Sequence, residues 1–272
     1  MKNDDTVIIA DCSSNHMGNM DIAFEMIKLA AEAGIDTVKF QSWRADNIPK
    51  DFPYYDSVYA RHYKTQLSDD DHIRLIEHCN DNNINFLTTC FDIDRVDFLA
   101  SLGISEIKVA SPDCVSFNLL DLLMKKFPRL IISTGMSTDE EIESMINHVK
   151  GHDVIVLHCV SIYPTPLDKV NLERIEWLKS FGVRVGFSDH SLGTEASMLA
   201  IAMGVEIIEK HFTLSRSLPG KDQSMSTEIN EFKRIVEWRD KVKIMRGEKN
   251  PPLTDGEIAL RDIYIGKWGN NK

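Results

Sequence analysis

The chain has 272 residues, 43% of them hydrophobic and 27% charged, and its formal net charge is -11 at pH 7. This composition is ordinary for a soluble globular protein and allows one large α/β domain or two small ones. The negative charge argues against sequence-independent binding to nucleic acid or to an anionic membrane, because both require clustered lysines and arginines. It does not exclude a small anionic ligand held by a few lysines in a local pocket.

The cysteines and the N-terminus indicate a cytoplasmic protein without a membrane anchor. The five cysteines are an odd number, widely spaced and without a Cys-x-x-Cys pair, so neither a disulfide framework nor a cysteine zinc site is indicated. The first residues are polar and run straight into an apolar strand, so no signal peptide is expected. No apolar run reaches the about 18 residues that a membrane-spanning helix requires.

Short apolar and β-branched runs recur along the chain, and helical patterns separate them. Residues 7–12 form the first predicted strand, and residues 21–33 form an amphipathic helix that Gly34 ends. Further strands are predicted at residues 37–43, 85–91, 106–111, 129–135 and 154–160, and two more lead into His190 and His211. Residues 228–245 form the last helix of this series, and the tail at 247–272 is expected to be short and polar.

The second predicted strand is followed by a long loop and then by a clear helix start. Residues 44–66 form a long loop with Pro49, Pro53 and several tyrosines, and loops of this length in compact domains are often functional, so we expect it to cover a site. Ser68 is a predicted N-cap, because three aspartates follow it in the first turn of the next helix.

The order of the elements predicts the fold. Eight strand–helix units within about 250 residues match a closed (β/α)8 TIM barrel better than an open sheet. The alternative, a doubly wound open sheet, is disfavoured because no Gly-rich G-x-G-x-x-G turn follows the first strand.

Two histidines at neighbouring strand ends suggest a metal site. His190 and His211 each follow a β-branched run, and a helix-length connection separates them, which is the pattern of a βαβ unit with parallel strands. Parallel neighbours lie about 4.8 Å apart, so the two imidazoles can share one ion such as zinc, manganese, iron or nickel. The alternative is that each histidine is a hydrogen-bonded residue at the end of its strand.

Polar residues gather where the predicted strands end, which is where barrel enzymes carry their active sites. Lys39 and Lys108 alternate with apolar neighbours, so both are expected to face the barrel interior and to require an anion there. That anion is either a carboxylate, from Asp11 or Glu209, or a ligand phosphate. The other polar residues of these strand ends are Ser13, Asn15, His16, Gln41, Thr89, Ser111, Asp113, Ser133, Thr134, His158, Ser161, Tyr163, Ser188, Asp189 and Lys210.

Seven ordered motifs in this chain resemble the barrel domain of the sialic acid synthase family. They are Ile-Ile-Ala-Asp-Cys-Ser-Ser-Asn-His-Met-Gly, Val-Lys-Phe-Gln, Ile-Lys-Val-Ala-Ser, Ile-Ser-Thr-Gly-Met, Leu-His-Cys-Val-Ser-Ile-Tyr-Pro, Gly-Phe-Ser-Asp-His-Ser-Leu-Gly and Glu-Lys-His-Phe-Thr-Leu. The resemblance spans residues 7 to about 261.

The resemblance implies an activity. It implies a transferase that condenses phosphoenolpyruvate with an amino-sugar aldehyde such as N-acetylmannosamine and with water, giving a nine-carbon 2-keto-3-deoxy acid and phosphate. It implies a divalent ion, usually Mn2+ with Mg2+, Co2+ or Zn2+ as alternatives, bound by His190 and His211. It also implies a homodimer.

The resemblance assigns further residues by position. The residues that match the phosphoenolpyruvate site of the family are Lys39, Gln41, Thr89, Lys108, Ser111, Ser133, Ser161 and Ser188. Tyr163, Asp113 and Asp222 match positions that contact the sugar. A carboxylate near the attacking water, Asp11 or Asp113, can orient or deprotonate it.

This sequence departs from the family pattern at the sugar end of the site. Asp11 and Asp113 stand where the family has glutamates, Pro112 replaces a glycine, and Lys221 and Gln223 stand where a proline and a histidine are usual. The family also continues into a small C-terminal antifreeze-like domain that this chain lacks, so we expect one barrel domain over residues 1–272. The loops at 44–66 and 215–226, or a separate capping protein, are then expected to complete the sugar pocket.

Two other functions remain open from the sequence. One is a different phosphoenolpyruvate-dependent aldol-type synthase acting on another aldehyde, including a phosphorylated one, with Arg216 and Lys221 supplying positive charge. The other is a catalytically weak relative that binds an anionic metabolite. Asp11 and Asp113, which are one methylene shorter than the glutamates of the family, motivate this second alternative.

Overall fold

A computed structural model describes residues 6–269, apart from the side chain of Asp262. Eight parallel strands form a closed barrel in sequence order, and β1 pairs with β8 to close it. This confirms the predicted TIM barrel. The strands are β1 (Val7–Asp11), β2 (Thr37–Ser42), β3 (Asn85–Cys90), β4 (Glu106–Val109), β5 (Arg129–Ser133), β6 (Asp153–Cys159), β7 (Arg184–Asp189) and β8 (Ile207–His211).

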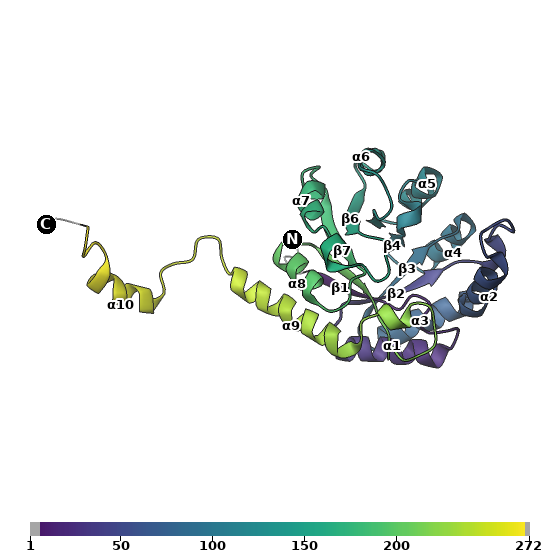
Figure 1. Cartoon of the computed structure of the whole chain (residues 1–272), viewed down its shortest axis with the longest axis horizontal. Coiled ribbons are helices and arrows are strands. Elements are labelled where there is room, and N and C mark those ends of the chain that lie inside the picture. The colour runs from purple at the N-terminus through teal and green to yellow at the C-terminus, as the bar shows by residue number, and fades with distance from the viewer. Residues whose placement is uncertain (1–5, 270–272) are drawn as a thin grey trace.

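Helices surround the barrel and follow their strands along the chain (Figure 1). Local sequence fixes where several of them begin: Ser68 and Thr138 each form a capping box with the acid three residues later. The Ser68 N-cap was predicted and is confirmed. The outer helices are α1 (Met20–Glu32), α3 (Asp69–Asp81), α4 (Val96–Ser101), α5 (Phe117–Lys126), α6 (Asp139–His148), α7 (Glu173–Lys179), α8 (Glu195–Ala202) and α9 (Ile229–Arg246).

Five short 3-10 helices lie in the loops between the main elements. They are η1 (Ala45–Asn47), η2 (Ile93–Arg95), η3 (Ser111–Asp113), η4 (Leu167–Lys169) and η5 (Gln223–Met225). All five lie between the carboxyl end of a strand and the next helix, after β2, β3, β4, β6 and β8 respectively.

The strands separate two apolar layers. Side chains such as Val38 and Phe40 face outward and pack against the helices in the main core. A smaller cluster fills the barrel interior with Ile9, Leu87, Ile131, Ile155, Leu157 and Ile207. Gly186 lies beside this inner cluster, where a Cβ atom would meet the Leu157 side chain at 2.3 Å. The interior is therefore packed with side chains and is not a channel.

Charged residues close the amino-terminal end of the barrel. The Arg129 guanidinium bonds Asp153 at 2.8 Å and Glu106 at 3.4 Å, and the Arg184 guanidinium bonds Asp153 at 2.8 Å and also Glu206. These residues open β4, β5, β6 and β7 or precede β8. This end is a structural network, because residues at this face of a TIM barrel contribute to stability while the opposite face carries the site.

The segment at 44–66 is more ordered than the predicted loop. It contains η1 and a helix, α2 (Tyr55–Thr65), which stands out from the barrel wall (Figure 1). The prediction of a loop was wrong over α2 because this helix is mostly polar and aromatic, so the apolar periodicity that reveals the other helices is weak here.

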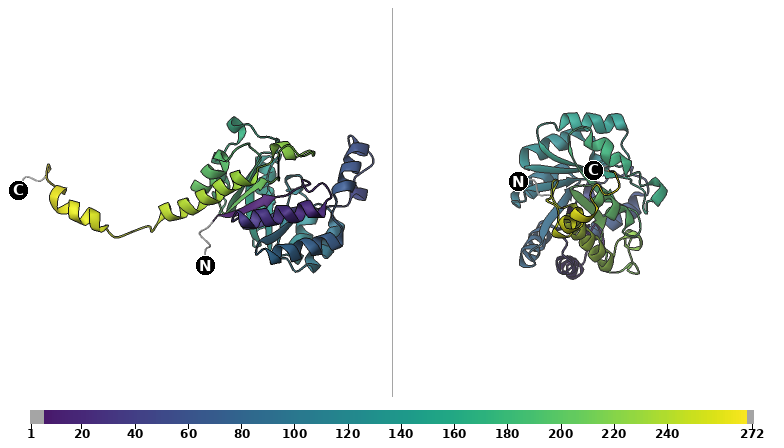
Figure 2. Two further views of the ribbon diagram at one scale, coloured as in Figure 1. Left: turned by 90° about the horizontal axis from the view of Figure 1, so that it is seen from below. Right: turned by 90° about the vertical axis from the view of Figure 1, so that its left-hand side faces the viewer.

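The tail also differs from its prediction. A helix, α10 (Asp255–Tyr264), follows an extended stretch and lies away from the barrel in Figure 1 and in the left view of Figure 2. Its N-cap is Thr254, in a capping box with Glu257. Ile258, Leu260 and Ile263 are half exposed, so this part of the tail is amphipathic and not simply polar. Among the helices of residues 6–269, none is both long enough and apolar enough to cross a membrane.

Candidate active site

A cavity of about 1230 Å³ opens at the carboxyl ends of the strands. All fourteen residues that the sequence analysis assigned to the site line this one cavity. They are Asp11, Lys39, Gln41, Thr89, Lys108, Ser111, Asp113, Ser133, Ser161, Tyr163, Ser188, His190, His211 and Asp222. The structure therefore brings the whole predicted set together. The volume of the cavity suits two small substrates held side by side.

Lys39 lies in an ionic cluster at the base of this cavity. Its ammonium is 2.9 Å from Asp11 and 3.7 Å from Glu209, and it donates a hydrogen bond to Thr89 at 3.2 Å. Burial by itself disfavours the charged amine, but the two carboxylates outweigh it, so the pKa of Lys39 is raised. The predicted inward orientation is correct, and the anion that Lys39 meets here is a protein carboxylate.

Lys108 is less fully compensated than Lys39. Its ammonium donates to the Ser133 hydroxyl at 2.6 Å and to its neighbour's carbonyl, that of Val109, at 2.8 Å. The nearest carboxylate is Glu209, at 3.9 Å. Burial therefore dominates and lowers the pKa of Lys108. An added anion at this position would stabilise the ammonium, which makes Lys108 a suitable contact for a phosphate or carboxylate ligand.

Glu209 connects the two lysines. It was named from the sequence as a possible carboxylate partner of these lysines, which the structure confirms, but it was not assigned to the site. One carboxylate oxygen accepts a hydrogen bond from Ser188 at 2.9 Å, while the other is buried without a hydrogen bond. Its position two residues before His211 in β8 places both side chains on the same face of the strand. That spacing is the signal from which Glu209 could have been found.

The two histidines face each other, as predicted. Their ring centroids are 5.4 Å apart. The His190 Nδ1 atom donates to the Val160 carbonyl at 2.9 Å, so Nε2 is the ring atom that can bind a ligand when the imidazole is neutral. Burial lowers the pKa of His190, but the neighbouring Cys159 and the Val160 carbonyl outweigh burial, so the pKa is raised. The His211 Nδ1 atom is buried without a hydrogen bond, and lies 3.6 Å from Asp11. Burial lowers the pKa of His211, which favours the neutral ring that a metal ion requires.

The donor set around the histidines fits an ion with open coordination positions. Among residues 6–269, no group of three or more His, Cys, Asp or Glu side chains is arranged to hold a metal ion. Two imidazoles would therefore bind an ion and leave its other positions to solvent or substrate. Carboxylates usually orient a ligating histidine by a hydrogen bond. Asp11 lies 3.6 Å from the His211 Nδ1 atom and makes no such bond here.

A second group of hydroxyls lies across the cavity from β8. The backbone N–H of Gly135 donates to the Ser111 hydroxyl at 3.1 Å, and Ser161 lies close by. A Cβ atom at position 135 would come within 2.2 Å of the Ser161 oxygen, so only glycine allows this approach. Hydrogen-bond donors gathered around a glycine backbone can hold an anionic oxygen. Gly135 was not predicted for this role from the sequence.

Tyr163, Asp113 and Asp222 line the outer part of the cavity. The Tyr163 ring lies 4.3 Å from the His190 ring, centroid to centroid, and burial raises the pKa of its hydroxyl, which therefore stays protonated. Asp113 accepts from Ser116 at 3.0 Å, and burial raises its pKa. Asp222 accepts from Ser13 at 3.0 Å. These groups can hydrogen-bond the hydroxyls of a sugar.

The family of the chain follows from comparison with known proteins. The family model of the NeuB family matches residues 26–251. N,N'-diacetyllegionaminic acid synthase of Legionella pneumophila is 36% identical over 94% of this chain and 77% of its own length. N-acetylneuraminate-9-phosphate synthase of Drosophila melanogaster is 32% identical over 86% of this chain and 67% of its own. The chain belongs to the NeuB family.

A solved structure of the family supports the same assignment. The crystal structure of N-acetylneuraminic acid synthetase from Leptospira borgpetersenii in complex with citrate has a TM-score of 0.88 and 31% identity, and the match covers 96% of this chain and 95% of that chain. The chain is thus an enzyme of the NeuB family, whose members form a carbon–carbon bond from phosphoenolpyruvate and a sugar substrate.

Some strand-end residues of this NeuB family member face away from the cavity. The His158 imidazole points outward and donates from Nε2 to the Val170 carbonyl at 2.7 Å. Lys210 also points outward, where its ammonium forms a buried ion pair with Asp189 at 2.9 Å. Arg216 is bonded to Glu231 and to the Ser226 carbonyl, and does not line the cavity. Its expected role as a free charge near the acceptor is therefore wrong.

The 44–66 segment forms one wall of the cavity mouth, as expected for a covering element. Trp43, Tyr54 and Arg61 are among the lining residues that it or its entrance supplies. Its two ends are fastened together: the Arg44 guanidinium donates to the Leu67 carbonyl at 3.3 Å, and the backbone N–H of Ala45 donates to Gln66 at 3.0 Å.

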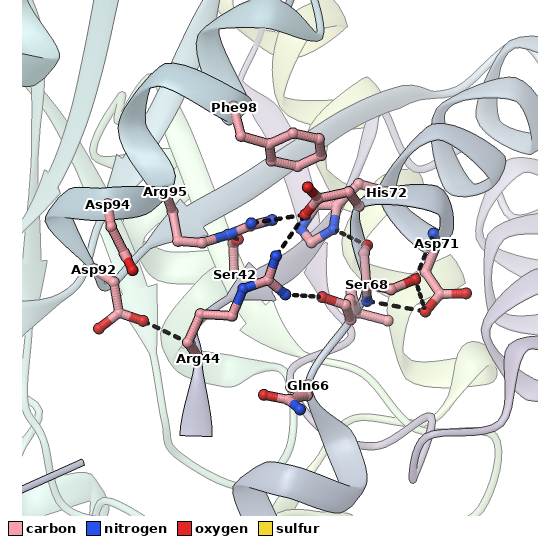
Figure 3. A network of polar contacts seen from close by, with 12 residues as sticks. Ser42, Arg44, Gln66, Ser68, Asp71, His72, Asp92, Asp94, Arg95 and Phe98 are labelled. Atoms are coloured by element: carbon pink, nitrogen blue, oxygen red, sulfur yellow. Dashed lines mark hydrogen bonds and ion pairs between the residues drawn. The ribbon is translucent and has the colours of Figure 1, made fainter. Parts of the chain in front are cut away.

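One carboxylate fixes the base of this wall. The Asp69 Oδ1 atom accepts from Arg44 at 2.6 Å and from Arg95 at 2.7 Å. The side chains of Arg44 and Arg95 converge from the segments that follow β2 and β3 (Figure 3). The Arg95 side chain is buried, stacks on the Phe98 ring at 4.3 Å and also donates to Ser42 at 3.0 Å. The 44–66 segment is therefore anchored to the ends of β2 and β3.

Proposed function

We propose that this enzyme condenses phosphoenolpyruvate with an N-acetylated amino-sugar aldehyde and water, and releases phosphate and a nine-carbon 2-keto-3-deoxy acid. The observation that carries this proposal is the common cavity of Lys39, Lys108, His190 and His211. Two buried ammonium groups suit a ligand with a carboxylate and a phosphate, and two imidazoles lie beside them. Relatives named as legionaminic acid and neuraminate 9-phosphate synthases support this class of acceptor.

The residues of the cavity divide into two binding regions. Lys108, with Ser133 and the hydroxyls of Ser111 and Ser161 beside Gly135, would hold the phosphoenolpyruvate anion. Gln41, Thr89 and Ser188 line the same inner part of the cavity. Tyr163, Asp113 and Asp222 would orient the sugar with its aldehyde toward the histidines. Fixing both reactants in this way converts a bimolecular encounter into an oriented reaction, which is a large contribution to catalysis.

A divalent ion is part of this proposal, with Mn2+ favoured over Mg2+, Co2+ or Zn2+. His190 and His211 would bind it, and when bound it would act as a Lewis acid on the acceptor carbonyl oxygen. The neutral His211 ring and the hydrogen bond that orients His190 both support this ligand role.

The chemistry requires one carbon–carbon bond to form and one carbon–oxygen bond to break. The enol carbon attacks the aldehyde carbon, and the cation left at the adjacent carbon takes up water. Phosphate then leaves with the bridging oxygen, and the carbonyl forms. Asp11 is well placed to orient this water, because Lys39 keeps it ionised: burial raises its pKa, but Lys39 and His211 lower it further.

Phosphate release with a panel of aldehydes tests the proposal. Phosphoenolpyruvate with N-acetylmannosamine, its 6-phosphate and a diacetamido-hexose should give phosphate and a keto acid of matching mass in at least one case. Release only with aldehydes that are not amino sugars would favour a different aldol-type synthase. Tight binding of phosphoenolpyruvate without turnover for any aldehyde would contradict the proposal and favour a metabolite-binding role.

A further inference from the structure

Two cations at the mouth of the cavity lack partners. Arg61 comes from α2, and Lys221 comes from the loop between β8 and α9, and both line the cavity. Within residues 6–269 neither side chain makes a hydrogen bond or an ion pair. The other lining cations are compensated: Lys39 and Lys108 by hydroxyls and carboxylates, and Arg44 by Asp69.

The acids around the mouth are already engaged with other donors. Asp92 accepts from the backbone N–H of Arg44 at 2.6 Å, and Asp222 accepts from the Ser13 hydroxyl. Asp113 accepts from Ser116. Arg61 and Lys221 are thus uncompensated in a chain whose net charge is -11, and both open into the same cavity.

Arg61 and Lys221 both influence the His62 side chain, although they come from distant parts of the sequence. After burial, which is the largest effect, both Arg61 and Lys221 contribute to lowering the pKa of His62. His62 also lines the cavity, and its Nδ1 atom is 2.8 Å from the Val58 carbonyl. The 44–66 segment and the 215–226 loop therefore both place positive charge at one opening.

The mouth cations lie at the outer end of the proposed acceptor position. Lys221 is the residue next to Asp222, which accepts a hydrogen bond from Ser13 of the loop after β1 and lines the cavity together with His211, so this loop reaches from the histidines to the rim. An aldehyde directed at the histidines would leave the far end of its sugar at this rim. We infer that Arg61 and Lys221 bind a phosphate monoester on the acceptor sugar, at the end remote from its aldehyde.

The chemistry of the pair favours phosphate. The planar guanidinium of Arg61 can bind two phosphate oxygens at once, and Lys221 adds a mobile point charge from the other side. A phosphate dianion matches two otherwise unpaired cations at the edge of a cavity. This inference rests on the proposed function, because it names the class of acceptor for the same site.

The kinetic test compares N-acetylmannosamine with its 6-phosphate. The unaltered enzyme should have a kcat/KM at least about tenfold higher for the phosphorylated sugar, since charge-assisted contacts to phosphate are lost without it. Arg61→Leu and Lys221→Met should each lower kcat/KM for the phosphorylated sugar by about 10- to 100-fold. They should change kcat/KM for the unphosphorylated sugar by less than about twofold. Lys64→Met is the matched control: Lys64 is exposed on the same helix and does not line the cavity.

A binding measurement separates this inference from the proposed function. N-acetylmannosaminitol 6-phosphate has no aldehyde and cannot react, so calorimetric titration in the presence of phosphoenolpyruvate reports on the subsite alone. Affinity that falls with Arg61→Leu and with Lys221→Met, but not with Lys64→Met, supports the subsite even if no turnover is found. Equal kcat/KM for both sugars, or equal affinity for the alditol with and without its phosphate, would overturn it.

Discussion

At the scale of single residues, the structure separates two buried lysines that look alike in the sequence. Lys108 faces the cavity, where hydroxyls and a distant carboxylate surround it. Lys210 faces the outer layer and pairs with Asp189. The first is available to a ligand, whereas the second is part of the folded framework.

We expect Lys108→Met to weaken phosphoenolpyruvate binding by about 1.5 to 3 kcal/mol, because one charge-assisted contact is lost. Isothermal titration calorimetry measures this directly. Lys210→Met should instead destabilise the protein by about 3 to 5 kcal/mol, since it leaves Asp189 buried without its cation. The folded fraction of that variant should bind phosphoenolpyruvate normally, and unchanged affinity in Lys108→Met would contradict the assignment.

Two histidines at strand ends, His211 inside the cavity and His158 outside it, can be compared in the same way. His211→Ala should reduce the bound divalent ion from near one per chain to background, as measured by metal analysis after dialysis against Mn2+, because one of two imidazole ligands is gone. His158→Gln is the control, since His158 also lies at a strand end but bonds the Val170 carbonyl outside the cavity. Full metal content in His211→Ala would remove the basis for the ion site.

At the scale of elements, the 44–66 segment depends on one shared carboxylate. Asp69→Asn keeps the shape of the side chain but removes the charge that holds both Arg44 and Arg95. We expect KM for the acceptor to rise severalfold and proteolysis within 46–65 to become faster, while phosphoenolpyruvate affinity stays the same. Steady-state kinetics and limited proteolysis measure both effects.

Asp70→Asn is the control for this variant, because Asp70 is the exposed neighbour in the same helical turn. It should leave both readouts unchanged. An acceptor KM that is unaffected in Asp69→Asn would show that the anchoring of this segment does not matter for the acceptor.

At the scale of the whole molecule, the two ends of the barrel have different roles. The cavity end carries the proposed chemistry, and the other end carries the network around Arg129 and Arg184. Desolvation raises the pKa of Asp153, but bonds to both arginines outweigh it, so the pKa lies below its ordinary value of 3.8. The stabilisation is therefore present above about pH 4 and is lost as the pH falls through the lowered pKa.

Asp153→Asn should accordingly lower the free energy of unfolding at pH 7 by about 1 kcal/mol, because the group is partly exposed and solvent screens its charge. The difference from the unaltered protein should shrink below pH 4, and kcat/KM should not change at any pH where both are folded. Urea unfolding at several pH values measures this. A loss of stability that persisted unchanged at low pH would exclude the ion pairs as its cause.

The assembly of the molecule remains a prediction. The expected homodimer and the separate capping protein were inferred from the family pattern. In the described part of the chain, α10 presents half-exposed apolar residues away from the barrel, and the 44–66 segment already forms one wall of the mouth. The second fact supports the expectation that a loop of this chain helps to complete the sugar pocket.

Sequence patterns alone were enough to predict the order of strands and helices, the barrel and the residues that gather at its carboxyl end. These features depend on local patterns, because alternation within a strand decides which side chains share a face. The same rule could have excluded Lys210 and His158, whose neighbours in the strand face inward. It could also have added Glu209, which shares the face of His211.

Which of these residues contact one another could be seen only in the folded barrel. Glu209 of β8 lies between Lys39 of β2 and Lys108 of β4, and Arg61 faces the same opening as Lys221. The position of α2 was also hidden, because its polar and aromatic residues lack the apolar period of a buried helix. The physical reason is that contacts across a barrel depend on the register and closure of all eight strands together, whereas the orientation of a side chain depends only on its own strand.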